Sequence, residues 1–126
     1  MAHPEWLKRY YRSPDWSLRK ALYYKSHRRQ CAACGTFKRI SLHHIAYSGD
    51  WGDLRNAADW GLEPDEVLMP LCCSGWFRKG CHNNVHRIER NYPDLRAATM
   101  AVVEAAQRRR RLMSLVTRHS DQRSQA

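Results

Sequence analysis

A pair of cysteines in a Cys-x-x-Cys-Gly motif constrains this chain more than any other feature of its sequence. Cys31 and Cys34 are separated by two alanines and followed by Gly35. A tight turn of this kind points both thiolates at one ion, and the glycine tolerates the positive φ that the turn requires. The motif therefore predicts a zinc knuckle. A thioredoxin-like redox motif, the alternative, would need a strand before it, whereas here a helix is expected.

A tetrahedral structural zinc site needs four ligands, and the chain has five cysteines to supply them. Cys31 and Cys34 form the first pair, and Cys81 is expected to be another ligand. Cys72 and Cys73 compete for the remaining place, because adjacent residues seldom both bind one ion. We expect Cys72, since it ends an apolar Leu-Met-Pro-Leu strand. The odd number of cysteines also argues against a closed disulfide framework.

The length of 126 residues is enough for one domain. We expect this domain at residues 1–118, with its core at about 31–91, flanking helices at 13–30 and 93–116, and a polar, disordered tail at 119–126. No apolar run approaches the roughly 18 residues of a membrane helix. No signal peptide is evident, so a cytoplasmic, reducing setting is expected, where clustered cysteines bind metal.

The charge of the chain favours a polyanionic partner. Lysine and arginine outnumber aspartate and glutamate by 22 to 12, which gives a formal net charge of +10. Such a charge suits nucleic acid better than mere solubility, and a membrane surface is disfavoured because no segment forms a clean basic amphipathic helix. The arginine run from 108 to 111 could also be a solvated helix face. The residues that we expect to contact DNA are Arg78, Lys79, Arg87, Arg108, Arg110 and Arg111.

Local signals predict helices around two short strands, which is an α+β arrangement. Ser13-Pro14-Asp15 indicates a helix start, with serine as the N-cap and proline at the first position. Leu18, Ala21 and Leu22 share one face of this helix and are expected to pack inward, while the basic residues of the same helix could pack or touch phosphates. Strands are predicted at Arg39–Ile45 and Val67–Leu71. Helices are predicted at Cys81–Asn91 and from Pro93-Asp94 onward.

Four of the seven histidines lie in two short segments, Ser-Leu-His-His-Ile and Cys-His-Asn-Asn-Val-His. His43 and His44 point to opposite faces of a strand, so one can bind a metal while the other acts on something beside it. His82 and His86 are four residues apart on a helix, which puts them on one face and lets both add ligands. A zinc protease is disfavoured, because Asn83 stands where that motif has glutamate.

These motifs together resemble those of the HNH endonuclease family, in the zinc-clipped ββα-metal type common in bacteria and their phages. The resemblance runs from about Tyr10 to His86 and rests on Arg-Ser-Pro-Asp-Trp, Cys-Ala-Ala-Cys-Gly, Leu-His-His-Ile, Met-Pro-Leu-Cys and Cys-His-Asn-Asn-Val-His. It implies a ββα-metal core, a structural zinc on the four cysteines named above, and metal-dependent hydrolysis of DNA in a bacterial or phage-infected cell.

The resemblance also assigns roles to the histidines. His43 matches the ligand of the catalytic metal, His44 the general base, His82 a metal ligand on the helix and His86 a second one. The chemistry agrees, because a neutral imidazole can take a proton from water and a divalent ion can polarise the phosphate. Imidazole ligands should favour Mn²⁺, Ni²⁺ or Zn²⁺ over Mg²⁺, which can still act if water and phosphate complete its shell.

The spacing of the second cysteine pair departs from the family pattern. Eight residues lie between Cys72 and Cys81, whereas the family usually has two. The segment Trp76-Phe77-Arg78-Lys79 is therefore an insertion in the knuckle. It leaves Cys73 as an alternative to Cys72.

A second departure concerns the residue that orients the base. Val67 stands where the family has asparagine or aspartate, so Asp65, Glu66 or a backbone carbonyl is expected to orient His44. This departure favours a rival function, a non-catalytic zinc-stabilised DNA-binding protein or an accessory of phage packaging that partners terminase or other packaging proteins. A redox Cys-x-x-Cys protein is a third class, and it predicts a titratable disulfide without tightly held zinc.

Overall fold

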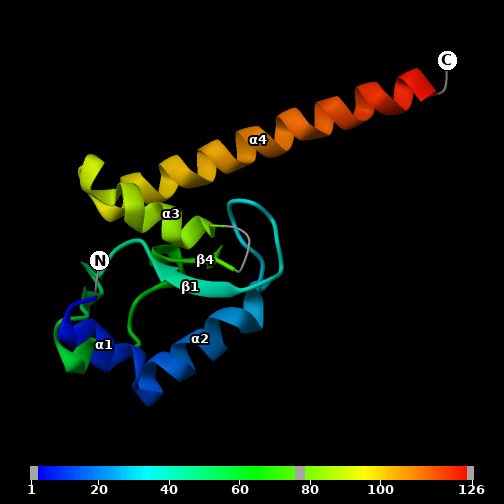
Figure 1. Ribbon diagram of the computed structural model, residues 1–126. Helices are drawn as coiled ribbons and strands as arrows, with labels where there is room; N and C mark the ends of the chain where they lie inside the picture. Colours follow the sequence, from blue (N-terminus) through cyan, green and yellow to red (C-terminus); the bar gives the residue numbers. More distant parts are fainter. Residues whose placement is uncertain (1–2, 76–78, 125–126) are drawn as a thin grey trace.

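A two-stranded antiparallel hairpin lies at the centre of the structure, a computed structural model that describes residues 3–75 and 79–124. Strand β1 spans Ile40–His44 and strand β4 spans Leu68–Cys72, each within one residue of its predicted bounds. The register places His43 opposite Met69 and His44 opposite Leu68. With helices on both sides of this hairpin, the predicted α+β class is confirmed (Figure 1).

Two layers of helices enclose the hairpin (Figure 1). Helices α1 (Glu5–Tyr11) and α2 (Pro14–Ser26) lie on one side, and helices α3 (Cys81–Ile88) and α4 (Leu95–Ser124) lie on the other. The C-terminal half of α4 extends away from the rest of the molecule. This helix continues to Ser124, through most of the segment 119–126 for which the sequence predicts disorder.

The start of α2 follows its sequence signal, but its buried face does not. The Ser13 side chain accepts a hydrogen bond from the Trp16 backbone N–H at 3.3 Å, and Pro14 is the first helical residue. The predicted packing face is wrong, since Leu18 is 62% and Leu22 is 48% exposed. The helix instead buries Trp16, Arg19 and Tyr23. Hydrophobicity alone misplaced this face, because a buried arginine with acidic partners and two aromatic rings fills the interior instead.

Each layer of helices closes its own apolar core against the hairpin. The core beneath α3 and α4 contains Cys31, Ala33, Leu71, Cys72, Cys81, Val85, Ala98, Val102, Val103 and Ala106. The core beneath α1 and α2 contains Leu7, Tyr10, Trp16, Tyr23, Leu42, Ile45, Leu54, Val67 and Leu68. The hairpin therefore presents one face, and one of its adjacent histidines, to each core.

The connection between the two strands is largely irregular. It contains the short pair β2 (Ser48–Gly49) and β3 (Gly52–Asp53) and the 3-10 turns Ala57–Asp59 and Asp65–Val67. A further 3-10 turn, Glu89–Asn91, completes the stretch predicted as one helix from Cys81. Within the described ranges, no helix combines the length and the apolar character needed to cross a membrane.

Candidate metal centres

Four cysteines from three separate segments converge on one point. Cys31 and Cys34 come from the loop after α2, Cys72 ends β4, and Cys81 begins α3. Their sulfur atoms all lie within 4.8 Å of one another, and the Sγ atoms of Cys34 and Cys72 are 3.6 Å apart. Tetrahedral Zn–S bonds of about 2.3 Å put sulfurs roughly 3.8 Å apart. This group, with the membership that the sequence predicted, could bind a structural metal such as zinc.

Backbone N–H groups donate hydrogen bonds to two sulfurs of this group. The N–H of Cys34 donates to the Cys31 sulfur at 3.4 Å, and the N–H of Cys81 donates to the Cys72 sulfur at 3.3 Å. A hydrogen bond with Cys81 lowers the pKa of Cys31 to about 4. Gly35 adopts φ 81°, the positive value expected of the glycine that closes the knuckle. The thiolate form that binds metal is thus favoured at Cys31. Burial raises the pKa of Cys72, and the hydrogen bond with Cys31 raises the pKa of Cys81, so these two thiols would lose their protons on binding an ion.

Cys73 lies apart from the four-cysteine group. Its backbone N–H donates to the Arg39 carbonyl at 2.7 Å, and its sulfur is 3.8 Å from Nδ1 of His82. The choice between adjacent cysteines is thereby resolved in favour of Cys72. Gly80 lets the chain pass close to the backbone of Cys73. A Cβ at position 80 would lie only 2.2 Å from the Cys73 carbonyl carbon.

Three histidines form a second group on the same side of the hairpin. His43 comes from β1, and His82 and His86 come from α3, with ligand atoms all within 4.8 Å of one another. The Nε2 atoms of His82 and His86 are 3.0 Å apart. Nδ1 of His86 is 3.2 Å from a carboxylate oxygen of Glu89. Because a carboxylate can only accept, His86 carries its proton on Nδ1 and turns the Nε2 lone pair toward His82.

A threonine on α4 fixes the tautomer of His43 in the same way. Nε2 of His43 is 3.0 Å from the hydroxyl of Thr99, and that hydroxyl donates to the Leu95 carbonyl at 2.8 Å. Since a hydroxyl has one hydrogen, it must accept from His43 when it donates to the carbonyl. His43 therefore holds its proton on Nε2 and keeps a lone pair on Nδ1. Neither Thr99 nor Glu89 was singled out from the sequence.

Burial keeps two of these three histidines, His43 and His82, uncharged. It lowers the pKa of His43 well below its usual value, with further lowering from His82 and His86. It also lowers the pKa of His82 to about 4, again with a contribution from His86. Both rings are therefore neutral at neutral pH and have lone pairs available. Three converging imidazoles, of which Thr99 and Glu89 hold His43 and His86, have the donor chemistry of a transition-metal site.

His44 faces the opposite core and takes no part in this group. Its side chain is fully buried among Tyr10, Tyr11 and Trp16. Its Nε2 is 2.8 Å from a carboxylate oxygen of Glu63, and its Nδ1 is 3.1 Å from the Tyr11 hydroxyl. Because the carboxylate accepts from Nε2, Nδ1 holds the lone pair and accepts from Tyr11.

Glu63 orients His44, which corrects the expectation of Asp65, Glu66 or a carbonyl. Both Glu63 oxygens accept from the Tyr10 hydroxyl, at 2.8 and 2.7 Å, and the Glu63 carbonyl accepts from Arg19 at 2.8 Å. Burial alone would raise the pKa of Glu63, but the hydrogen bonds from His44 and Tyr10 outweigh it and lower that pKa. Asp65 instead pairs with Arg19.

The basic residues predicted to contact DNA are distributed over two regions. Arg87 lines a cavity of about 410 Å³ together with His3, His82, Asn83 and His86, so it lies at the opening of the histidine group. Arg110 lies against the cysteine knuckle, where a Cβ at Gly35 would be 3.0 Å from its Nη2 atom. Lys79, Arg108 and Arg111 are exposed, and Arg78 lies outside the described residues.

Comparison of the chain with protein-family models, with curated proteins and with solved structures gives no match. What the cysteine group and the histidine group can do chemically is therefore inferred from their own geometry. The thiol group is buried and could hold a structural ion. The imidazole group is partly open, with His82 and His86 half-buried and lining a cavity.

Proposed function

We propose that this protein is a metal-dependent DNA endonuclease of the HNH type, with β1, β4 and α3 as a ββα-metal core. The observation that carries the proposal is the converging histidine group of His43, His82 and His86, which spans the hairpin and the helix. It opens to solvent beside Arg87 and adjoins the four-cysteine group through α3. The resemblance of the same motifs to HNH enzymes supports this assignment.

The donor set suits a divalent cation at the histidine group. Three imidazole ligands favour Mn²⁺, Ni²⁺ or Zn²⁺, and Mg²⁺ would depend on water and phosphate for its remaining ligands. Such an ion would polarise the scissile phosphate and stabilise the leaving oxygen. The protein's own part is to hold His43 and His86 in fixed tautomers, through Thr99 and Glu89, so that their lone pairs face the same point.

We assign His44 as the base, acting through Tyr11. The Glu63 carboxylate keeps the His44 proton on Nε2, so the Nδ1 lone pair can receive a proton from the Tyr11 hydroxyl at 3.1 Å. Tyr11 lines a cleft that also includes His82, next to the proposed metal position. A water in that cleft can give its proton to Tyr11 as Tyr11 passes its own to His44.

Cleavage of supercoiled plasmid in Mn²⁺ or Mg²⁺ tests the proposal. We expect the wild-type protein to nick or linearise the plasmid, Tyr11→Phe to slow this by about 10²-fold or more, and Tyr92→Phe to leave it unchanged. Tyr92 is an exposed tyrosine and serves as the matched control. Equal rates for all three proteins would remove Tyr11 and His44 from the reaction.

A non-catalytic, zinc-stabilised DNA-binding or packaging accessory protein is the second candidate. The observation in its favour is that His44 is fully buried and both of its ring nitrogens are hydrogen-bonded. It predicts that the wild-type protein binds zinc and DNA but cleaves no plasmid with any of Mg²⁺, Mn²⁺, Ni²⁺ or Zn²⁺. That result would replace the nuclease assignment.

The contact between Thr99 and His43 gives a prediction on metal affinity. Thr99→Val removes the hydroxyl that accepts from His43 Nε2, so we expect metal binding at the histidine group to weaken by about 10- to 100-fold. Thr117→Val is the control, because Thr117 makes the same i−4 hydrogen bond on an exposed part of α4. Calorimetric titration with Mn²⁺ measures the metal affinity of both variants. Equal affinities would mean that Thr99 does not orient the ligand.

A further inference from the structure

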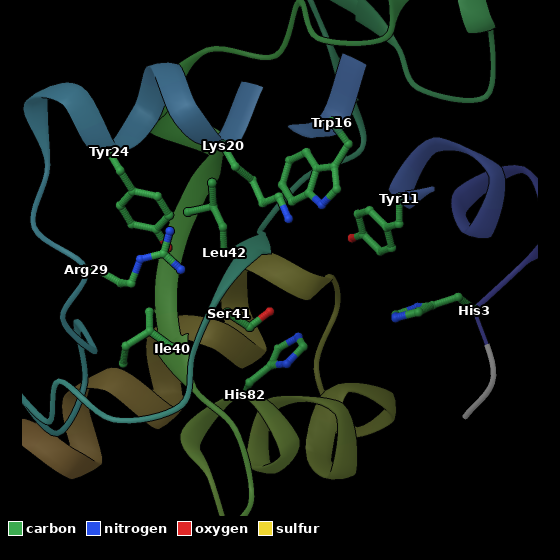
Figure 2. Close-up of a pocket in the computed structure, with 10 residues that line it drawn as sticks. All are labelled: His3, Tyr11, Trp16, Lys20, Tyr24, Arg29, Ile40, Ser41, Leu42 and His82. Carbon is green, nitrogen blue, oxygen red and sulfur yellow. The ribbon is translucent and has the colours of Figure 1, made fainter. Parts of the chain in front are cut away.

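A cleft between α2 and β1 lies next to the histidine group. It has a volume of about 350 Å³ and is lined by ten residues, none of which is acidic: His3, Tyr11, Trp16, Lys20, Tyr24, Arg29, Ile40, Ser41, Leu42 and His82. Figure 2 shows Lys20 and Arg29 reaching into it from one side and Ser41 and His82 facing them from the other. Since His82 also belongs to the histidine group, the cleft and that group share a wall.

The two cations of the cleft are held without being neutralised. The Lys20 ammonium lies 5.7 Å from the centre of the Trp16 ring, and the Arg29 guanidinium lies 4.3 Å from the centre of the Tyr24 ring. Among the described residues, no carboxylate forms an ion pair with Lys20 or Arg29. Cation–π contacts orient a cation while leaving its positive charge available to an anion.

A hydroxyl in the wall of the cleft has no partner in the described structure. The Tyr24 oxygen is the one buried side-chain atom there without a hydrogen bond. Burial raises the pKa of Tyr24, so the group stays protonated and can only be satisfied by an acceptor or by water. Leaving such a group unsatisfied is unfavourable, so the site favours a ligand that can accept its hydrogen bond. An anionic oxygen bound between Arg29 and Lys20 would supply that acceptor.

We propose that this cleft binds one nucleotide of a single DNA strand, with its phosphate on Lys20, Arg29 and the Tyr24 hydroxyl, next to the phosphate at the histidine group. The inference rests on the proposed nuclease function for the identity of the neighbouring site. Cations interleaved with aromatic rings are the combination that single-strand binding grooves use. The volume is at the lower end of the roughly 300–1,000 Å³ of ligand sites, so it fits one nucleotide rather than a base pair. Unpaired or frayed DNA is therefore the preferred substrate.

Fluorescence anisotropy with a labelled deoxythymidine decamer tests this inference, with no divalent cation added. We expect Lys20→Ala/Arg29→Ala to weaken binding by at least about tenfold and to reduce the salt slope by about 0.7, since the two cations hold one phosphate and each single-strand phosphate contact contributes about 0.7. The control is Lys25→Ala/Arg28→Ala, which removes the same charge from exposed positions near the end of α2 and outside the cleft. It should change binding by no more than about twofold. Tyr24→Phe, which removes only the hydroxyl, should weaken binding by about threefold or more.

Three results would overturn the inference. One is an equal loss of affinity in the cleft variant and in the control variant. Another is a duplex of the same length that binds as tightly as the single strand and loses as much affinity in the cleft variant. The third is thymidine monophosphate displacing the decamer at a concentration equal to the decamer's own Kd, which would mark a site for free nucleotides. Because the assay contains no catalytic metal, it measures binding independently of cleavage. A failure of the cleft inference can therefore be told apart from a failure of the proposed nuclease function.

Discussion

Cys72→Ser should abolish zinc binding at the cysteine group and strongly destabilise the protein, whereas Cys73→Ser should do neither. Cys31, Cys72 and Cys81 belong both to the four-cysteine group that could bind zinc and to the core beneath α3 and α4. Structural zinc contributes about 10–16 kcal/mol in zinc-finger peptides, more than the roughly 5–15 kcal/mol that stabilises a whole domain. A missing ligand should therefore cost about 5 kcal/mol or more, which lowers Tm by roughly 15–20 °C in a chain of this size.

Metal analysis and thermal unfolding of the purified proteins measure this difference. We expect about one zinc per chain in the wild type and in Cys73→Ser, and much less in Cys72→Ser. A chelator should lower the wild-type Tm toward that of Cys72→Ser. Cys73 is a stringent control, because it is the adjacent residue and its sulfur contacts His82 instead. Zinc retained by Cys72→Ser and lost by Cys73→Ser would reverse the assignment.

Features that depend on short spacings in the sequence were predictable. The turn at Cys31 and Cys34, the pairing of His82 with His86 and the cap at Ser13 each follow from geometry within one turn of chain. The opposite orientation of His43 and His44 follows from the pleat of a strand. Local geometry also placed Cys72 at the end of its strand, within reach of the other thiols.

Features set by long-range packing were not predictable. Glu63 reaches His44 because the irregular connection between the strands returns along α1, and no spacing rule relates the two positions. Thr99 reaches His43 because α4 packs across the hairpin. The buried face of α2 is likewise decided by Arg19, which a hydrophobic pattern assigns to the surface although it pairs with Asp65. In each case a polar side chain can be buried because a residue distant in the sequence forms hydrogen bonds or an ion pair with it.

Glu63→Ala should destabilise the protein by about 3–5 kcal/mol, the largest effect that we expect outside the cysteine group. The carboxylate is fully buried, lies 3.7 Å from the Arg19 guanidinium, and accepts from His44 and from the Tyr10 hydroxyl. Removing it leaves the His44 and Tyr10 donors without their acceptor and takes a carboxylate neighbour from Arg19, which keeps Asp65 as a partner. Urea unfolding at pH 7 measures the change. Glu66→Ala is the matched control, since Glu66 is exposed, and it should change stability by less than about 0.5 kcal/mol.

The pH dependence of Glu63→Gln separates the charge of this residue from its packing. Because the pKa of Glu63 is lowered in the folded protein, its carboxylate stabilises the fold fully above the ordinary pKa of 4.5, and this contribution is lost as the pH falls through the folded pKa. Glu63→Gln should therefore be less stable than wild type at pH 7, and the gap should narrow below about pH 4.5. His43 and His82 also lose stabilisation as the pH falls below about 6.5, but equally in both proteins, so the difference isolates Glu63. A gap that stays constant with pH would mean that Glu63 acts through shape alone, and the tautomer of His44 would then need another cause.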